Sequence, residues 1–302
     1  CTMVVLAALT ALACKHDKGP ATTENETPPS SAQPRPAVSQ PDGTPGTPFL
    51  WRVNGKGTEE SYLFGTMHLG VNAEKQIHPS VWSAFDKSEQ VVVEIISSEI
   101  GVSQTQELFF LKDPQGLRKG LNDSQWQTLA ATIKGYPDAQ LARTSPLMAS
   151  VLITSSWLPT QPPMDQYIEN RARSARKSVH GLEGFEETKA FAHSDYHMGY
   201  LAMMLDDLDK AKTELLSMHA AYLRGDRKAM VELVFSEENL AKFPKLYEEL
   251  FLARNKAWVP KLERHFQNGR TFVAVGAGHL LGKDSVVAML EARGYEVEPI
   301  AR

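Results

Sequence analysis

The chain has 302 residues, of which 42% are hydrophobic, with 32 Lys and Arg against 36 Asp and Glu. This is the composition of a globular protein with one large domain or two small ones. The formal net charge of −4 gives no general attraction to a polyanion, so we expect no nucleic-acid partner. The two cysteines, Cys1 and Cys14, exclude Cys-x-x-Cys metal sites. Any metal must therefore be held by histidines and carboxylates.

Residues 2–13 form an uncharged apolar run that is too short to span a membrane. The run has the length of a signal-peptide hydrophobic region and ends in small residues directly before Cys14. It resembles the bacterial lipobox, although Ala11 stands where Leu is usual. We therefore expect residues 1–13 to be a signal peptide with a truncated start, and Cys14 to carry lipid, palmitate included. A frayed apolar tail of a soluble protein is the alternative.

The next segment, residues 14–48, is rich in proline and threonine and has almost no large apolar side chain. It cannot bury enough surface to offset the cost of ordering it, so we expect a disordered tether. A lipidated cysteine with a tether is typical of a lipoprotein held on the cell envelope. Lys15 is not the Asp that usually retains a lipoprotein in the inner membrane, which favours the outer membrane by resemblance.

Hydrophobic patterning predicts one folded domain over residues 49–302. Strand-length apolar runs lie near both ends of this region, and helical periodicity fills most of the middle. We therefore expect an α/β fold, a single domain with a mixed central sheet formed by N- and C-terminal strands and a large helical insert. The predicted strands are 49–53, 61–65, 90–95, 178–182, 271–275 and 296–300. The main predicted helices are 80–87, 103–157 with proline interruptions, 164–177, 196–223, 243–266 and 280–293.

One short pattern occurs twice, a strand followed by Gly-x-x-His. It is seen at Gly65 with His68 and again at Gly276 with His279. Glycine lets the backbone turn and approach a ligand closely, and neutral imidazole is a common ligand of divalent transition metals. Glu94 follows three valines at the end of another buried strand, where a carboxylate is almost never left unpaired.

With these motifs the chain resembles the TraB/GumN family, which includes the animal TIKI proteins. The resemblance covers most of residues 49–302. Its blocks are Tyr62-Leu-Phe-Gly-Thr-Met-His68, Val92-Val-Glu94, Met164-Asp-Gln-Tyr-Ile168, Gly181-Leu-Glu183, Arg254-Asn255, Val275-Gly-Ala-Gly-His-Leu280 and Gly294-Tyr-Glu-Val297. The resemblance implies a metal-dependent peptidase site in which His68, Glu94 and His279 hold a divalent ion of the Mn, Co or Zn class. More distant relatives by fold include erythromycin-esterase-like hydrolases and a haem-binding lipoprotein.

Hydrolysis at such a site also needs a base and a group that stabilises the oxyanion. Glu94, if it is not a ligand, or Glu183 is the candidate base. Arg254, with Asn255 beside it, and the N-terminus of the helix after His279 are candidate holders of the oxyanion or of a carboxylate.

Structural interpretations of the same residues stay open. Glu94 can pair with Arg254 as an internal salt bridge, and His68 and His279 can each satisfy a backbone carbonyl. Asp165 can be a helix N-terminal charge. His193 and His197 have the spacing of a metal pair, but Ser194 stands where a zincin has its Glu, so we interpret them as surface or packing histidines.

The sequence thus predicts a lipid-anchored, cell-envelope metal-dependent hydrolase that acts on a peptide or protein substrate. The alternative is a non-catalytic envelope binding protein for haem, a metal or a small ligand. An interaction module whose site has lost function is a third possibility. The sequence leaves the substrate, the metal and the oligomeric state open.

Overall fold

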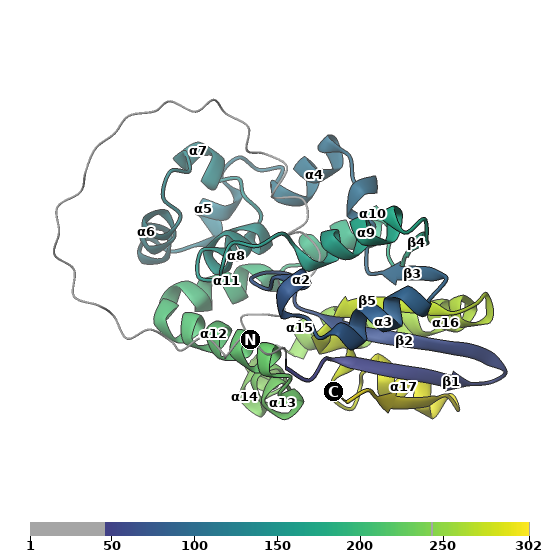
Figure 1. Cartoon of the computed structure of the whole chain (residues 1–302). Coiled ribbons are helices and arrows are strands. Elements are labelled where there is room, and N and C mark those ends of the chain that lie inside the picture. Colours follow the sequence, from purple (N-terminus) through teal and green to yellow (C-terminus); the bar gives the residue numbers. More distant parts are fainter. Residues whose placement is uncertain (1–45, 243, 302) are drawn as a thin grey trace, which may run out of the picture.

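A six-stranded sheet runs through the centre of the structure, a computed structural model that describes residues 46–242 and 244–301 (Figure 1). The strand order is β4-β3-β5-β2-β1-β6. The strands are β1 (Leu50–Gly55), β2 (Thr58–Thr66), β3 (Gln90–Val93), β4 (Ser178–Gly181), β5 (Thr271–Gly276) and β6 (Glu296–Pro299). Each of the six predicted strands is present, and the predicted mixed sheet is confirmed. The predicted signal segment, Cys14 and tether residues 14–45 lie outside the described residues.

The four strands β4, β3, β5 and β2 are parallel neighbours, whereas β1 is antiparallel to both β2 and β6. Thr66 pairs with Gly276 across β2 and β5, and Val93 pairs with Ala274 across β3 and β5. Because neighbouring parallel strands run in the same direction, their carboxyl ends meet at one edge of the sheet. In α/β folds this edge is where sites are assembled.

The helices fall into three groups along the chain. Between β2 and β3 lie α2 (Ala73–Gln76) and α3 (Pro79–Lys87). The large helical insert lies between β3 and β5 and is broken only by β4, as predicted. It contains η1 (Ser97–Glu99), α4 (Val102–Phe109), α5 (Gly116–Gly120), α6 (Asp123–Thr132), α7 (Asp138–Leu141), α8 (Pro146–Ser155), α9 (Met164–Ser174), α10 (Phe185–Ala192), α11 (Tyr196–Asp206), α12 (Leu208–Arg224), α13 (Arg227–Val234), α14 (Glu237–Lys242), α15 (Pro244–Tyr247), η2 (Glu248–Leu252) and α16 (Ala253–Gln267).

The last helix differs from the prediction. A helix was expected from Leu280, directly after His279, but α17 spans Val286–Ala292. His279 instead lies in a 3-10 turn, η3 (Ala277–Leu280), and the side chain of Ser285 caps α17. The glycines at 276, 278 and 282 around this turn explain the difference, because glycine is a poor helix former. The helix N-terminus therefore does not follow His279 directly, and we withdraw it as a candidate anion holder.

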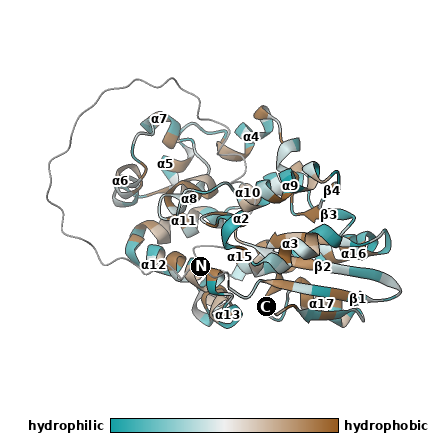
Figure 2. Ribbon diagram, viewed as in Figure 1, coloured by the Kyte–Doolittle hydropathy of each residue, from teal (hydrophilic) through white to brown (hydrophobic). Residues whose placement is uncertain are grey.

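The core lies on both faces of the parallel strands. Val91, Val92 and Val93 of β3 are fully buried, as expected for a strand covered by helices on each side. The rings of Phe64 and Phe272 lie 5.9 Å apart between centroids on adjacent strands. Figure 2 shows the central strands largely in the hydrophobic colours, and the hairpin end of β1 and β2 in the hydrophilic ones. Burial of this apolar surface supplies the main stabilisation of the fold.

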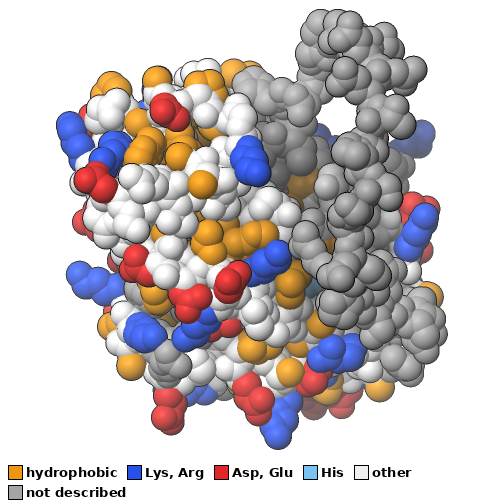
Figure 3. Space-filling model, turned by 90° about the vertical axis from the view of Figure 1, so that its left-hand side faces the viewer, with side chains coloured by type: hydrophobic (Ala, Val, Ile, Leu, Met, Phe, Trp, Pro, Cys, Tyr) orange, Lys and Arg blue, Asp and Glu red, His pale blue; other side chains and the backbone are white. Residues whose placement is uncertain are grey.

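The outer surface is polar and mixed in charge. On the face shown in Figure 3, basic and acidic side chains are interspersed, with hydrophobic side chains scattered between them. Among the described helices, none combines the length and the apolar character that a membrane crossing requires.

Candidate functional site

Four of the candidate site residues follow the carboxyl ends of the four parallel strands. His68 comes two residues after β2, Glu94 directly follows β3, and His279 lies in the turn after β5. Glu183 comes two residues after β4. The backbone keeps these strand ends in register, because the Glu183 N–H donates to the Glu94 carbonyl at 2.8 Å. The sheet thus brings together residues that are up to 211 positions apart in the sequence.

His68 is held by Asp165 from the first turn of α9. The Nδ1 atom of His68 hydrogen-bonds to Oδ2 of Asp165, and the His68 carbonyl accepts from the Met164 N–H at 3.1 Å. Burial acts to lower the pKa of His68, but the Asp165 carboxylate, followed by Glu94, raises it above its ordinary value. The Nε2 atom is therefore the ring nitrogen that faces the interior of the site.

His279 is held in a similar way by Asn255 from α16. Its Nδ1 atom lies 2.7 Å from Oδ1 of Asn255, whose Nδ2 donates to the Asp284 carbonyl at 2.8 Å. Because that second bond fixes the orientation of the amide, Nδ1 of His279 carries the proton, and the lone pair of Nε2 accepts from Nη1 of Arg254 at 3.3 Å. Burial, then the charges of Arg254 and His68, hold the pKa of His279 well below its ordinary value. The imidazole is thus neutral at neutral pH.

The two motif glycines leave room for these side chains. A Cβ on Gly276 would lie 3.1 Å from Nε2 of His68 and 3.3 Å from Oε1 of Glu94. A Cβ on Gly65 would lie 3.0 Å from Cα of Ala277 in the turn that carries His279. Both glycines are needed for close approach, and the His68 nitrogen and the Glu94 oxygen meet beside Gly276.

Glu94 is buried, and each of its two carboxylate oxygens accepts a hydrogen bond. Its Oε1 accepts the Gly276 N–H at 2.7 Å, and its Oε2 accepts from Nη2 of Arg254 at 2.7 Å. The salt bridge considered from the sequence is therefore present. The same contacts leave a lone pair on Oε1, because a carboxylate oxygen can accept more than one partner.

Arg254 lies at the centre of the cluster, in which it is bound by two carboxylates. Besides Glu94, it donates from Nε and Nη2 to Glu183 at 2.6 and 3.0 Å. Its Nη1 is 3.3 Å from Nε2 of His279, and its guanidinium carbon is 4.7 Å from the centre of the Trp258 ring. Burial acts to lower the pKa of Arg254, but Glu183 and Glu94 raise it. The guanidinium therefore stays charged.

Glu183 differs from Glu94 in that both of its oxygens accept from Arg254. Its Oε1 accepts from Arg254 and from Nε1 of Trp258, the latter at 2.9 Å, and its Oε2 accepts from Arg254. This environment suits a residue that fixes the guanidinium. Of the two carboxylates considered as a base, Glu94 is the better placed.

The helix that carries Arg254 and Asn255 begins after a π-helical turn, η2. Such single π turns are rare and are frequent at functional sites, because they change the direction in which the following side chains point. Arg254 and Asn255 come directly after this turn, and both are buried.

Comparison with known proteins identifies the family. The model of the TraB/PrgY/gumN family matches residues 49–299. The chain belongs to this family. The match includes each residue of the cluster: His68, Glu94, Asp165, Glu183, Arg254, Asn255 and His279. No curated protein and no solved structure matches the chain.

Two observations on this TraB/PrgY/gumN site fit a divalent cation. Histidines that ligate a metal almost always donate their other ring N–H to an oxygen acceptor, as the Nδ1 atoms of His68 and His279 do here. The cluster also holds three carboxylates against one guanidinium: Glu94 and Glu183 pair with Arg254, and Asp165 pairs with His68. Even with His68 protonated, one negative charge stays unbalanced in this cluster.

The ligand set is not closed in the structure. Within residues 46–242 and 244–301, no group of three or more His, Cys, Asp and Glu side chains has the geometry to hold a metal ion. The physical reason is the contact between Arg254 and Glu94, which places a positive charge beside the carboxylate and beside Nε2 of His279. A metal ion would have to share Glu94 with Arg254.

The sequence did not assign the contacts that two side chains make in this cluster. For Asp165 the sequence allowed the interpretation of a helix N-terminal charge. In the structure its carboxylate contacts His68 directly. Trp258, whose ring packs against that of His279 with 4.3 Å between centroids, was not considered. Its position four residues after Arg254, on the same helix face, was the available signal.

His193 and His197 do not form a metal pair. His193 ends α10 and His197 lies in α11, and their Nε2 atoms contact different backbone carbonyls, those of Glu107 and Phe191. The interpretation of His197 as a packing residue agrees with its complete burial.

Proposed function

We propose that this protein is a metal-dependent hydrolase of the cell envelope that cleaves peptide bonds. The observation that carries the proposal is the paired support of His68 and His279. Each imidazole has its Nδ1 engaged by a side-chain oxygen and its Nε2 in the cluster around Glu94 and Arg254.

In this proposal His68 and His279 hold a divalent ion through Nε2, with Oε1 of Glu94 as the third protein ligand or as the base beside it. A bound divalent ion polarises a carbonyl oxygen and lowers the pKa of water towards neutrality. Asp165 and Asn255 orient the two imidazoles, and Gly276 keeps the space between them open.

Arg254 supplies a fixed positive charge next to the reacting groups. Glu183 binds Nε and Nη2, and the Trp258 ring lies 4.7 Å from the guanidinium carbon, so the guanidinium is held beside His279. An ion bound at Nε2 of His279 would take the place of the Nη1 contact and leave Nη1 as a free donor. A donor fixed in this way can stabilise negative charge that develops on a carbonyl oxygen without reorganisation. Glu183 is assigned to positioning Arg254, and Asn255 to positioning His279.

The experiment begins with metal binding to the purified protein. Titration with Mn²⁺, Co²⁺ and Zn²⁺ in a calorimeter should give about one ion per chain for at least one metal. His68→Ala and His279→Ala should abolish this binding, whereas His78→Ala, at the start of α3, should leave it unchanged. Unchanged stoichiometry in both cluster variants would contradict the metal assignment.

Turnover is then measured on a peptide library by mass spectrometry. We expect metal-dependent cleavage that is lost in Glu94→Gln at unchanged metal loading. A non-catalytic metal-binding protein is the alternative, and the observation that favours it is burial, since His68, Glu94, Arg254 and His279 are each at most 8% exposed. Stoichiometric metal without cleavage of any peptide would establish the alternative.

We also propose that Cys14 carries lipid and anchors the domain to the cell envelope, in the outer membrane. The support is the apolar segment before Cys14 and the proline-rich segment after it. Cells labelled with a clickable palmitate analogue should give a labelled protein, and Cys14→Ser should be unlabelled and unprocessed. Equal labelling of the variant would contradict the anchor.

A further inference from the structure

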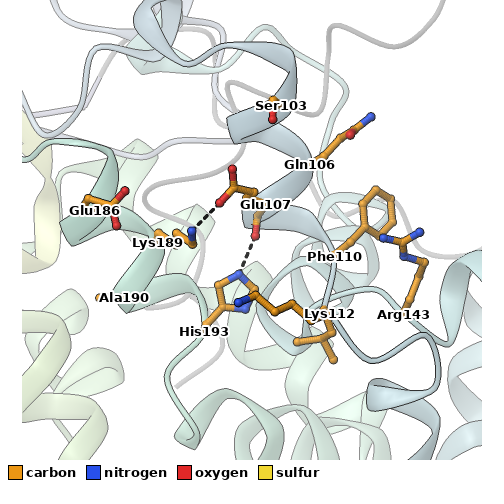
Figure 4. A pocket seen from close by; sticks show the side chains of 11 residues that line it. Ser103, Gln106, Glu107, Phe110, Lys112, Arg143, Glu186, Lys189, Ala190 and His193 are labelled. Carbon is orange, nitrogen blue, oxygen red and sulfur yellow. Dashed lines mark hydrogen bonds and ion pairs between the residues drawn. The ribbon is translucent and has the colours of Figure 1, made fainter.

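A hollow lies between α4 and α10, outside the cluster (Figure 4). It is a cavity of about 630 Å³, within the usual size range of ligand sites. Its walls are α4, residues 110–112, Arg143 and α10. Each residue that lines it is exposed or half-buried, so it is an open groove. An open groove suits an extended chain, which can lie along it, better than a small molecule that must be enclosed.

The middle of the groove is bridged by contacts within the protein. Lys189 forms an ion pair with Glu107, and Nε2 of His193 contacts the Glu107 carbonyl at 2.6 Å (Figure 4). These contacts join α10 to α4 and neutralise the acidic side chain at the centre. Glu186 lies on the side of the groove away from Arg143.

The other end of the groove carries two cations and an aromatic ring. Neither Lys112 nor Arg143 has a carboxylate partner in the part of the chain that the structure describes. The guanidinium carbon of Arg143 lies 4.9 Å from the centre of the Phe110 ring. The Leu111 N–H donates to the Arg143 carbonyl at 2.7 Å, so the two segments are held together. This end presents positive charge beside apolar surface.

Val102 adds apolar surface at the far end of α4. It is 72% exposed, an unusual environment for a valine on a short amphipathic helix, and it precedes Ser103, which lines the groove. A ligand that lies along the groove from Lys112 toward Ser103 would therefore contact the cations and Phe110 at one end and Val102 at the other.

The helix α10 connects the groove to the cluster. Glu183, two residues before α10, is bound by Arg254, and the Phe191 ring of α10 lies 5.2 Å from the Arg254 guanidinium carbon. Lys189 and Ala190, next to Phe191 in the helix, line the groove. One face of α10 thus contacts the central guanidinium of the cluster while another forms a wall of the groove.

We propose that this groove binds an acidic segment of a polypeptide substrate. Carboxylates of the segment pair with Lys112 and Arg143, and a neighbouring apolar side chain packs on Phe110. The charge complementarity selects an acidic chain, and the shared helix places its docking site next to the cluster. As a statement about substrates, this inference rests on the proposed peptidase function.

The test is peptide binding to the metal-free, full-length protein, measured by fluorescence anisotropy. The probe is a fluorescein-labelled octapeptide with two adjacent glutamates beside a phenylalanine, and the matched probe has glutamines in their place. We expect saturable binding of the acidic probe that weakens with added salt, and about tenfold weaker binding of the glutamine probe.

Two charge-reversed variants locate the site. Lys112→Glu/Arg143→Glu should weaken binding of the acidic probe at least about tenfold, since two attractions become repulsions. Lys75→Glu/Lys134→Glu changes the net charge equally at exposed positions outside the groove, and it should bind as the unmodified protein does. Equal binding of the two probes, or equal affinity of the two double variants, would overturn the proposal. A third result would also overturn it: Lys112→Glu/Arg143→Glu no longer sediments with phosphatidylglycerol vesicles, as the unmodified protein does, but still binds the acidic peptide with unchanged affinity.

Failure of the groove and failure of the proposed function give different results. Binding to the metal-free protein does not depend on turnover. If the groove binds the acidic probe selectively but the protein cleaves no peptide, the docking site is supported and the peptidase function is contradicted. If the acidic probe is cleaved, Lys112→Glu/Arg143→Glu should raise KM about tenfold with kcat unchanged. Cleavage with an unchanged KM in this variant would retain the peptidase and overturn the groove.

Discussion

Arg254 and Glu94 form a buried ion pair, with 2.7 Å between Nη2 and Oε2, that joins the helical insert to the carboxyl end of β3. The pair serves two purposes. It fixes α16 against the sheet and, in the proposed function, it sets the charge that an ion, a substrate carbonyl or a water molecule would meet at the cluster. The first purpose concerns stability and the second concerns chemistry, so variants can separate them.

Removing Arg254 should be strongly destabilising. Arg254→Met leaves Glu94 and Glu183 buried without their cation, which we expect to cost about 3–5 kcal/mol in the free energy of unfolding. Urea denaturation measures this value. The matched control is Arg270→Met, whose ion pairs with Glu59 and Glu89 are exposed and which should cost about 1 kcal/mol or less.

The double variant Arg254→Met/Glu94→Gln tests whether the unpaired charge is the cause. Replacing the carboxylate by a neutral amide removes part of the penalty, so the double variant should be less destabilised than the sum of the two single variants. Strict additivity would show that the arginine acts through packing on Trp258 and Phe191 instead.

Replacing Gly276 should disturb the cluster. In Gly276→Ala the new Cβ would lie 3.1 Å from Nε2 of His68 and 3.3 Å from Oε1 of Glu94, so these side chains must move. We expect a loss of about 1–3 kcal/mol in the free energy of unfolding and weaker metal binding. Thermal unfolding and calorimetry measure the two effects.

Gly199 provides the control for that substitution. It lies within α11, and a Cβ there would meet nothing within 4 Å. Gly199→Ala should therefore stabilise the protein by about 0.5–1 kcal/mol, because alanine is the better helix former. If both alanine variants behave alike, the space at Gly276 has no specific purpose.

Asp165 should control the affinity of the cluster for a metal through His68. Asp165→Leu removes the acceptor at Nδ1, which we expect to weaken metal binding about 10- to 100-fold. Asp165→Asn keeps an oxygen acceptor of the same shape and should have the smaller effect. Isothermal titration of the metal into the three proteins checks the order, and equal affinities would remove Asp165 from this role.

His197 should make stability depend on pH. Burial, opposed by a hydrogen bond to the Phe191 carbonyl, lowers its pKa to about 4, and its Nδ1 has no partner among the described residues. The unfolded chain binds a proton near pH 6.5 and the folded chain does not. Stability from this group is therefore complete above pH 6.5 and is lost as the pH falls toward 4.

The variant His197→Gln retains a donor for the carbonyl but does not titrate. Between pH 7.5 and 4.5 the unmodified protein should lose about 2–3 kcal/mol more unfolding free energy than the variant does. Denaturation at several pH values measures the difference. Parallel curves for the two proteins would show that His197 contributes nothing to acid sensitivity.

Much of the sheet was predictable because its strands are buried on both faces. A continuous apolar run such as Val91 to Val93 predicts a buried strand from the sequence alone. The start of α17 was placed too early at Leu280, because Leu280 and Leu281 were taken as part of the helix. The polar residues 282–285 that follow them end in the serine that caps α17, and this was the local signal for the later start.

The functional residues divide in the same way. The repeated Gly-x-x-His pattern and Glu94 stand out in the sequence because each follows a strand, and the family match includes them. The contacts of Asp165 with His68, of Asn255 with His279, and of Trp258 with Glu183 could not be read from spacing. These partners come from two helices, α9 and α16, whose placement depends on long-range packing.

The composition determined that this is a globular chain, and the positions of its two cysteines determined that any metal must be held by histidines and carboxylates. Periodicity determined the strands, and motif spacing determined which histidines follow them. Only the tertiary structure decided that Arg254 would lie between Glu94, Glu183 and His279. These partners are 25 to 160 residues apart in the sequence, and their contacts are set by parallel strand register and by helix packing, neither of which leaves a local signal in the sequence.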